Sequence, residues 1–379
     1  MNKSHATDLP LERFARPNGI YLLNHSVGVP PASLLSHVAD ELMPGWLTHP
    51  DQAWQQWMAE LEGFHTELAR LFNHEPEWFC HQANVSSGMT KVLHALKPAS
   101  SRPVILLSEQ AFPSLGYVAR AATGTGYQTR YLPAEANAAD PETWRKAIAG
   151  DVGVVLIGHA ESNTGITLPV AEILEVVRDA GALSIVDIAQ SAGLLPIDLR
   201  EWRPDVVVGT SVKWLCGGPG AGFLWVRPDV IDRCRPLDVG WFSHQDPFEF
   251  DIRDFRLAPD ARRFWGGTPS PIPAALARHS IALINDIGVP AIQQHNQTLT
   301  QRLIDGVDEH LLMSPLDVGK RSGTVVIDPG PGQRSALMAL LAAAEVHVDE
   351  RAKGIRISPH IVNTEADIDT TLELLAGAQ

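Results

Sequence analysis

The chain has 379 residues, 45% of them hydrophobic and 20% charged, a composition typical of a globular protein with one large domain and a smaller one. Its formal net charge of −14 argues against a nucleic-acid partner, because binding phosphates requires a concentrated basic face. No run approaches the roughly 18 apolar residues of a membrane span, and charged residues interrupt the first twenty positions, so the cytoplasm is the expected location.

The first part of the chain predicts alternating strands and helices. A polar arm is followed by a short strand or loop entry at 20–26 and by a helix that begins near Pro30 and Pro31. Apolar side chains at 54–72 recur at helical spacing, which is typical of a helix packed on a core. Short apolar runs then alternate with helical stretches, and the expected strands are 104–107, 153–157, 183–186, 206–208 and 223–226. This alternation predicts a mostly parallel, doubly wound α/β sheet.

The last third of the chain has a different pattern. It reads as two consecutive helices at 274–287 and 290–310, a strand after Gly323, an Ala/Leu-rich helix and a strand after Gly354. This pattern predicts a separate α+β domain. We therefore expect three parts, which are an N-terminal arm (1–20), a large domain (21–264) and a small C-terminal domain (265–379).

Lys213 is the strongest candidate for a reactive residue. The strand at 183–186 ends at Asp187, and the strand at 206–208 leads through Thr210 to Lys213. Open α/β sheets bind ligands at the carboxyl ends of their strands, so Asp187 and Lys213 are expected in one pocket. A buried lysine can form a Schiff base, and a carboxylate facing a pyridinium nitrogen accompanies it in pyridoxal phosphate enzymes. An Asp–Lys pair that only caps strand ends fits the spacing equally well.

Three further motifs supply polar or aromatic groups to the same edge of the sheet. Ser86, Ser87 and Gly88 precede a helical run, and free N–H groups at a helix start suit a phosphate. Phe112 follows the strand at 104–107 and could stack on a flat cofactor or belong to the core. Ser162 follows the strand at 153–157. Each motif alone is also compatible with ordinary capping or packing, and their convergence favours a binding site.

Other cofactor signatures do not fit the sequence. The glycine-rich run at 217–222 leads into a strand and not into a helix, so it is not a dinucleotide fingerprint, and no P-loop occurs. The fifteen histidines include no HExxH pair, and three widely spaced cysteines form no CxxC motif. We therefore expect no metal site and no disulfide framework.

Taken together, the motifs resemble the class V aminotransferase family of fold-type I pyridoxal phosphate enzymes. The resemblance covers most of residues 20–370 and rests on the order and intervals of six segments. These are Ser-Ser-Gly-Met-Thr (86–90), Ala-Phe-Pro-Ser (111–114), Glu-Ser-Asn-Thr-Gly (161–165), Val-Asp-Ile-Ala-Gln (186–190), Thr-Ser-Val-Lys (210–213) and Gly-Ile-Arg-Ile-Ser-Pro (354–359).

The resemblance implies roles for these residues. Lys213 is expected to form the internal aldimine and to move the α-proton of the substrate, and Asp187 is expected to hold the pyridinium proton. Ser162 or Gln190 would lie near the phenolic oxygen of the cofactor. The phosphate-binding positions of the family match Gly88, Met89, Thr90 and Thr210 in this chain.

Within the family the chain looks most similar to kynureninases. Phe112 resembles their stacking phenylalanine, Trp241 a tryptophan that reaches the phosphate, and Thr268 a residue donated across a homodimer with shared active sites. Arg356 matches the arginine that binds the substrate carboxylate, and Asn24 is a further candidate for substrate binding. Two positions depart from kynureninases, which carry tyrosine at Val212 and histidine at Gln190.

The leading hypothesis is a pyridoxal phosphate enzyme that cleaves the side chain of an amino acid in the kynureninase manner, as a hydrolase or lyase. The alternative is transamination. A cysteine desulfurase is less favoured, because no cysteine follows Cys234. A non-catalytic relative and a nicotinamide-dependent oxidoreductase are also less favoured.

Overall fold

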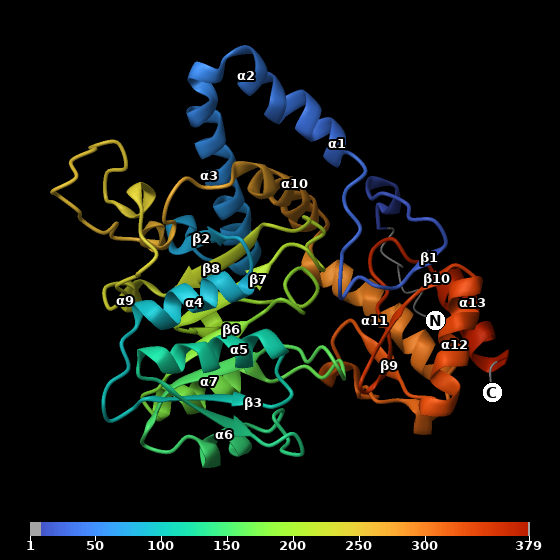
Figure 1. The fold of residues 1–379 in the computed structure, drawn as a ribbon. Coiled ribbons are helices and arrows are strands. Elements are labelled where there is room, and N and C mark those ends of the chain that lie inside the picture. The colour runs from blue at the N-terminus through green and yellow to red at the C-terminus, as the bar shows by residue number, and fades with distance from the viewer. Residues whose placement is uncertain (1–8, 378–379) are drawn as a thin grey trace.

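The computed structural model describes residues 9–377 and has a seven-stranded sheet at its centre (Figure 1). The strand order is β2-β8-β7-β6-β5-β3-β4, and only β8 runs antiparallel to its neighbours. The strands are β2 (Phe79–Gln82), β3 (Val104–Ser108), β4 (Gln128–Leu132), β5 (Val152–Gly158), β6 (Leu183–Asp187), β7 (Val206–Thr210) and β8 (Gly222–Val226). The expected doubly wound α/β architecture is confirmed.

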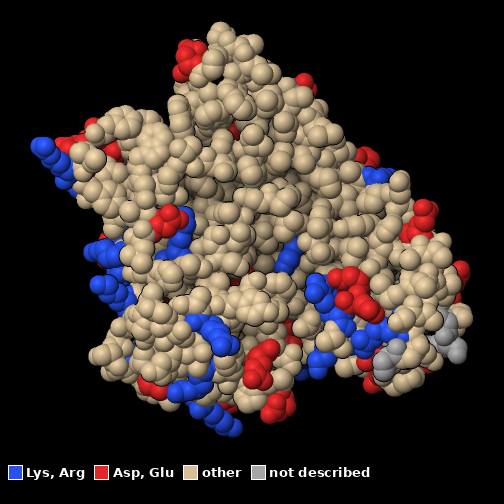
Figure 2. Space-filling model, in the orientation of Figure 1, with Lys and Arg blue, Asp and Glu red and all other residues tan. Residues whose placement is uncertain are grey.

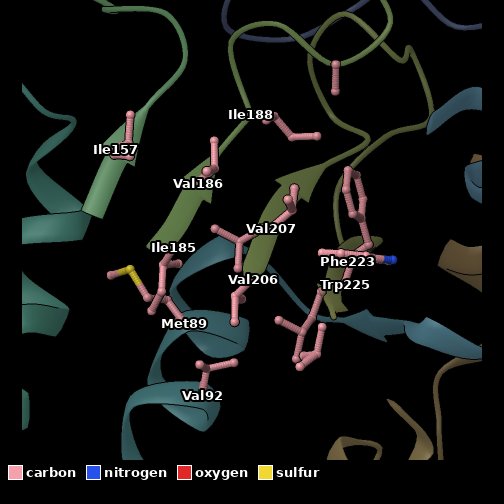
Figure 3. Close-up of a cluster of buried hydrophobic side chains, with 14 of the residues drawn as sticks. Met89, Val92, Ile157, Ile185, Val186, Ile188, Val206, Val207, Phe223 and Trp225 are labelled. Atoms are coloured by element: carbon pink, nitrogen blue, oxygen red, sulfur yellow. The ribbon is translucent and has the colours of Figure 1, made fainter. Parts of the chain in front are cut away.

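Helices cover both faces of this sheet. They are α3 (Ala53–Phe72), α4 (Val85–Ala95), α5 (Pro113–Ala121), α6 (Pro141–Ala147), α7 (Val170–Asp179), α8 (Leu199–Trp202), α9 (Pro228–Ile231) and α10 (Pro271–Ile287). Figure 3 shows how one layer of the core is built, with Met89 and Val92 of α4 beside Ile185 and Val206 of the strands. The central strands are buried on both faces, which explains why their sequences are continuous apolar runs.

The C-terminal part has its own small sheet and core. Its strands β9 (Val325–Ile327), β11 (Asp349–Arg351) and β12 (Gly354–Ile357) pair in the order β11-β12-β9. Three helices pack on them, which are α11 (Val289–Asp305), α12 (Pro331–Ala343) and α13 (Glu365–Gly377). They form the orange and red unit at the right of Figure 1.

Two segments cross the expected domain borders. Near the N-terminus, β1 (Ile20–Tyr21) pairs in parallel with β10 (Val346–His347), and Leu22 belongs to the C-terminal core. Helix α10 was expected in the small domain, but it packs along α3 and contributes to the core of the large sheet (Figure 1). The N-terminal segment therefore joins the small unit, and α10 joins the large one.

The N-terminal helices stand apart from both cores. The segment begins with α1 (Leu34–His37), continues through a π-helical turn at Val38–Leu42, and ends with α2 (Met43–Thr48). In Figure 1 these helices extend from the upper end of α3. No helix within residues 9–377 is long and apolar enough to cross a membrane.

Candidate active site

A cavity of about 250 Å³ opens at the carboxyl ends of the parallel strands. Its wall includes the last residue of four neighbouring strands, which are Ser108 of β3, Gly158 of β5, Asp187 of β6 and Thr210 of β7. Lys213 also lines it. The topology thus brings polar side chains that are distant in sequence to the edge where open α/β sheets bind ligands.

Lys213 lies in the loop after β7, and its side chain is partly buried. Burial lowers the pKa of Lys213, the negative charge of Asp187 opposes this effect, and the nearby charge of Arg356 adds to it. The backbone of the loop is held by the N–H of Gly28, which donates to the carbonyl oxygen of Val212 at 2.8 Å. A Cβ at Gly28 would lie 1.9 Å from the carbonyl oxygen of Lys213, so only glycine fits there.

Asp187 is a partly buried carboxylate with a free side facing the cavity. Its Oδ1 accepts the N–H of Ala189 at 2.8 Å, and Oδ2 has no hydrogen-bond partner among residues 9–377. Burial raises the pKa of Asp187, and the charge of Lys213 acts in the opposite direction. The carboxylate oxygens of Asp187 lie more than 4.0 Å from Nζ of Lys213, so the two groups form no direct ion pair. Their opposite charges still attract each other across the cavity. A cation placed between them would relieve the desolvation of the carboxylate.

The start of α4 forms another wall of the cavity. The side chain of Asn84 caps the helix by accepting the N–H of Ser87 at 2.9 Å, and Asn84, Val85 and Ser86 line the cavity. The backbone N–H groups of Val85 and Ser86 have no helical partner because they belong to the first turn. They are therefore available to an anion at the positive end of the helix dipole.

The expected phosphate residues on this helix lie further along it. The N–H of Gly88 already donates to the carbonyl oxygen of Asn84 at 3.2 Å. Met89 is buried in the core beneath the sheet, as Figure 3 shows, and Thr90 lies in the second turn. None of the three lines the cavity. Helix α4 begins at Val85, directly after its cap at Asn84, so Gly88, Met89 and Thr90 lie beyond its first free N–H groups.

Phe112 and Ser162 reach the cavity as expected. Phe112 precedes α5, its side chain is 43% exposed, and the centre of its ring lies 5.3 Å from Nζ of Lys213. A core phenylalanine would be covered, so its exposure favours a role at the surface of the pocket. Ser162 and Thr210 also line the cavity.

The amide of Gln190 is held on both sides by hydrogen bonds. Its Nε2 donates to the carbonyl oxygen of His25 at 3.2 Å, and its Oε1 accepts the indole N–H of Trp214 at 3.2 Å. The amide therefore lines the cavity with a fixed orientation. It also connects the N-terminal segment to the loop that carries Lys213.

Arg356 and Asn24 lie beside the cavity and not on its wall. The guanidinium of Arg356 is buried, and its Nη1 donates to the backbone oxygen of Ser162 at 3.1 Å. Its other edge is paired with Asp349. Asn24 donates to the backbone oxygen of Ser358 at 2.9 Å, while its buried Oδ1 has no partner in the described part of the chain.

Trp241 and Thr268 do not reach the cavity of their own chain. Trp241 packs edge-on against Trp54 and Phe242 and lines a separate cavity of about 400 Å³. Thr268 is exposed in the loop before α10. Within residues 9–377 no hydrogen bond or aromatic contact joins Trp241 or Thr268 to Lys213.

Several residues of the site were not predicted from the sequence. Asn84 could have been found, because asparagine directly before a helical run is a common cap. Asp349 had no such signal, and Glu161 belonged to the segment at 161–165 without a role being assigned to it. Glu161 lines the cavity, burial raises its pKa, and Thr164 donates to its Oε2 at 2.6 Å.

The arrangement fits a flat, phosphorylated aldehyde with a basic ring nitrogen. Asp187 offers an unpaired carboxylate oxygen for a ring N–H, Lys213 an amine of lowered pKa for the aldehyde, Phe112 an exposed ring for stacking, and α4 two free N–H groups for the phosphate. This combination is what pyridoxal phosphate requires. No cluster of three or more metal-binding side chains occurs within residues 9–377.

Comparison with known proteins supports this assignment. Relatives that cover most of the chain include a kynureninase of Deinococcus radiodurans (31% identity, 81% of this chain and 77% of that protein). They also include the uncharacterized aminotransferase YcbU of Bacillus subtilis (27% identity, 86% of this chain and 85% of that protein).

Solved structures show the same fold. A cysteine desulfurase from Thermococcus onnurineus superposes with a TM-score of 0.84 at 20% identity, covering 95% of this chain and 94% of that one. The cystine C-S lyase C-DES superposes with a TM-score of 0.85 at 24% identity, covering 95% and 97%. Residues 50–371 match the Aminotransferase class-V family. The chain therefore belongs to the class V aminotransferase family of pyridoxal phosphate-dependent enzymes.

Proposed function

We propose that this enzyme acts on an α-amino acid and cleaves its side chain in the manner of a kynureninase. The observation that carries the proposal is the facing pair of Lys213 and Asp187 in one cavity, with the carboxylate-binding candidate Arg356 beside it. Similarity to kynureninases over four fifths of the chain supports the side-chain cleavage. Transamination is the second candidate, because Val212 and Gln190 depart from kynureninases and because the aminotransferase YcbU is also similar.

Cysteine desulfuration is not supported. That reaction needs a thiolate that can attack, and an accessible thiol of low pKa is the usual source. Cys80, Cys216 and Cys234 are all buried, and burial raises the pKa of their thiols to about 12, 12 and 11. The likeness to desulfurase structures is therefore a likeness of fold.

Each residue has a physical task in the proposed reaction. Bound pyridoxal phosphate supplies an electron sink for the substrate's α-carbon. Asp187 would keep its ring nitrogen protonated, and Lys213 would hold the cofactor and then carry a proton to or from the α-carbon. The first turn of α4 would bind the phosphate, with Thr210 nearby, while Phe112 stacks on the ring. Arg356 would orient the substrate by its carboxylate.

The proposal predicts a visible absorbance band from lysine-bound cofactor that changes when an amino acid is added. Titrating the holoenzyme with the twenty common amino acids and L-kynurenine, followed by product analysis, separates the candidates. Side-chain cleavage leaves the cofactor in its aldehyde form and releases a shortened amino acid, whereas transamination leaves the cofactor aminated and yields an oxo acid. A protein that shows no such band with added cofactor would contradict the proposal.

The enzyme is also proposed to be a homodimer in which Thr268 completes the partner's site. Thr268 is exposed and does not line the cavity of its own chain. The segment that precedes it also exposes the large apolar side chains of Phe250 and Ile252. In Figure 2 the part of the surface over α1–α3 carries few charges, and Leu35 and Leu47 are strongly exposed there. Burying such apolar surface is a common driving force for association.

Mixing two inactive or weakened variants tests this arrangement. In a mixed dimer, a Lys213→Ala chain provides Thr268 to the intact lysine of a Thr268→Ala chain. Random exchange should restore tight cofactor binding in about a quarter of all sites, measured by absorbance after dialysis. Light scattering should report twice the monomer mass. A fully active monomer, or no recovery after mixing, would refute the shared site.

A further inference from the structure

Arg356 is the end of a chain of buried and partly buried hydrogen bonds that links three separate parts of the sequence. Its Nε donates to Oδ1 of Asp349 at 2.8 Å, and its Nη2 donates to Oδ2 of the same carboxylate. Nε2 of His25 lies 3.1 Å from Oδ1 of Asp349, and Nδ1 of His25 lies 2.7 Å from Oγ of Ser358. Oγ of Ser358 lies 2.8 Å from Oγ1 of Thr324. The side chains of Arg356 and His25 are 4% and 1% exposed.

The partners fix the direction of every hydrogen bond in this chain. An ionised Asp349 can only accept, so the proton of a neutral His25 must be on Nε2. Nδ1 of His25 then accepts from the hydroxyl of Ser358, which in turn accepts from Thr324. Burial lowers the pKa of His25, which favours this neutral form. Burial would raise the pKa of Asp349, but its hydrogen bonds with His25 and Arg356 hold that pKa well below its ordinary value.

A count of donors shows what remains for a ligand. A guanidinium has five N–H groups. Asp349 takes two of them and the backbone oxygen of Ser162 takes a third, so one N–H on Nη1 and one on Nη2 have no partner among residues 9–377. Two N–H groups on neighbouring nitrogens are what a carboxylate needs for a paired, planar contact.

We propose that Asp349 and His25 are positioning residues that hold Arg356 with its two remaining N–H groups available to the carboxylate of the substrate. The inference rests on the proposed function, which makes Arg356 the carboxylate-binding residue. His25 belongs to the segment after β1. In this segment the N–H of Gly28 donates to the carbonyl oxygen of Val212, and the carbonyl oxygen of His25 accepts from Nε2 of Gln190. The N-terminal segment thereby couples the orientation of Arg356 to the loop of Lys213.

The competing interpretation is that Asp349 occupies Arg356 and must be displaced by substrate. The two interpretations predict opposite results for Asp349→Asn. If Asp349 positions the guanidinium, the variant loses the paired contact, because the amide NH₂ faces an N–H donor and cannot accept from it. If Asp349 competes with the substrate, removing its charge strengthens carboxylate binding.

The experiment compares L-alanine with ethylamine, which differ only in the carboxylate, by spectral titration of the wild-type and variant holoenzymes. Asp349→Asn should weaken L-alanine binding at least about tenfold, the loss expected for hydrogen bonds to a charged group, and leave ethylamine binding unchanged. His25→Phe, which keeps an aromatic ring but removes both nitrogens, should shift the same ratio in the same direction by a smaller factor. It serves as the second variant if Asp349→Asn folds poorly.

Asp369→Asn is the matched control. Asp369 makes the same paired contact with Arg302, through Nε at 2.5 Å and Nη2 at 2.8 Å, on the exposed surface of the same unit. This variant should leave both affinities unchanged. Equal weakening of both ligands by Asp349→Asn, or tighter binding of L-alanine, would overturn the positioning role. A wild-type holoenzyme that responds to neither ligand would instead contradict the proposed function itself.

Discussion

Replacing Lys213 with alanine should reduce turnover by at least about a thousandfold, because the variant loses both the covalent hold on the cofactor and the group that moves the α-proton. The lowered pKa of Lys213 means that more of its amine is neutral, and therefore nucleophilic, than in an exposed lysine at the same pH. Reducing the wild-type holoenzyme with borohydride and digesting it should yield one peptide carrying a phosphopyridoxyl group on Lys213. The alanine variant should yield none.

Lys91 provides the control for this substitution. Among the described lysines, only Lys91 and Lys213 are partly buried, and Nζ of Lys91 donates to the backbone oxygen of Phe264 at 2.8 Å and pairs with Asp238 at 3.1 Å. It does not line the cavity. Lys91→Met should lower stability but keep the borohydride label on Lys213. Labelling of another lysine in the wild type, or near-normal turnover of Lys213→Ala, would exclude Lys213 as the reactive residue.

The sequence was most informative where the central strands end. Asp187 and Lys213 could be placed in one pocket because continuous apolar runs identify buried parallel strands, and such strands deliver their next residues to a common edge. The strands β2 and β4 were not predicted, because they are not continuous apolar runs. Both lie at the edges of the sheet, and β4 is partly exposed, so their sequences contain polar residues and lack a clear apolar run.

The remaining site residues depend on information that a single sequence does not carry. The phosphate positions were expected at Gly88–Thr90 because they match those of the resembled family, whereas the cap at Asn84 decides where the helix begins in this chain. The contacts of His25 and Asp349 join positions more than 300 residues apart, and no local pattern signals such a pairing. The roles expected for Trp241 and Thr268 remain predictions, because both side chains lie away from the cavity of their own chain.

Asp187→Asn should separate catalysis from stability. The amide keeps the shape of the side chain but cannot hold a proton on the ring nitrogen, so turnover should fall at least about a hundredfold and cofactor affinity should weaken. The covalent link to Lys213 should persist, because the charge of Asp187 raises the pKa of Lys213 and its removal leaves more neutral amine. The cofactor-free variant should melt at the same temperature as the wild type or higher, since a carboxylate whose pKa is raised by burial is unfavourable in the empty fold.

Asp205 offers the contrasting case of a buried aspartate that the fold needs. It accepts the N–H of Ser184 at 2.7 Å and its hydroxyl at 2.9 Å, and it pairs with Arg227 at 2.9 Å. Asp205→Asn should therefore lower the melting temperature, because hydrogen bonds to a charged acceptor are lost, while turnover of the folded fraction stays normal. Calorimetry and steady-state kinetics on the two variants would measure both effects. If Asp187→Asn behaved like Asp205→Asn, losing stability and keeping turnover, Asp187 would be a structural carboxylate and not the partner of the cofactor.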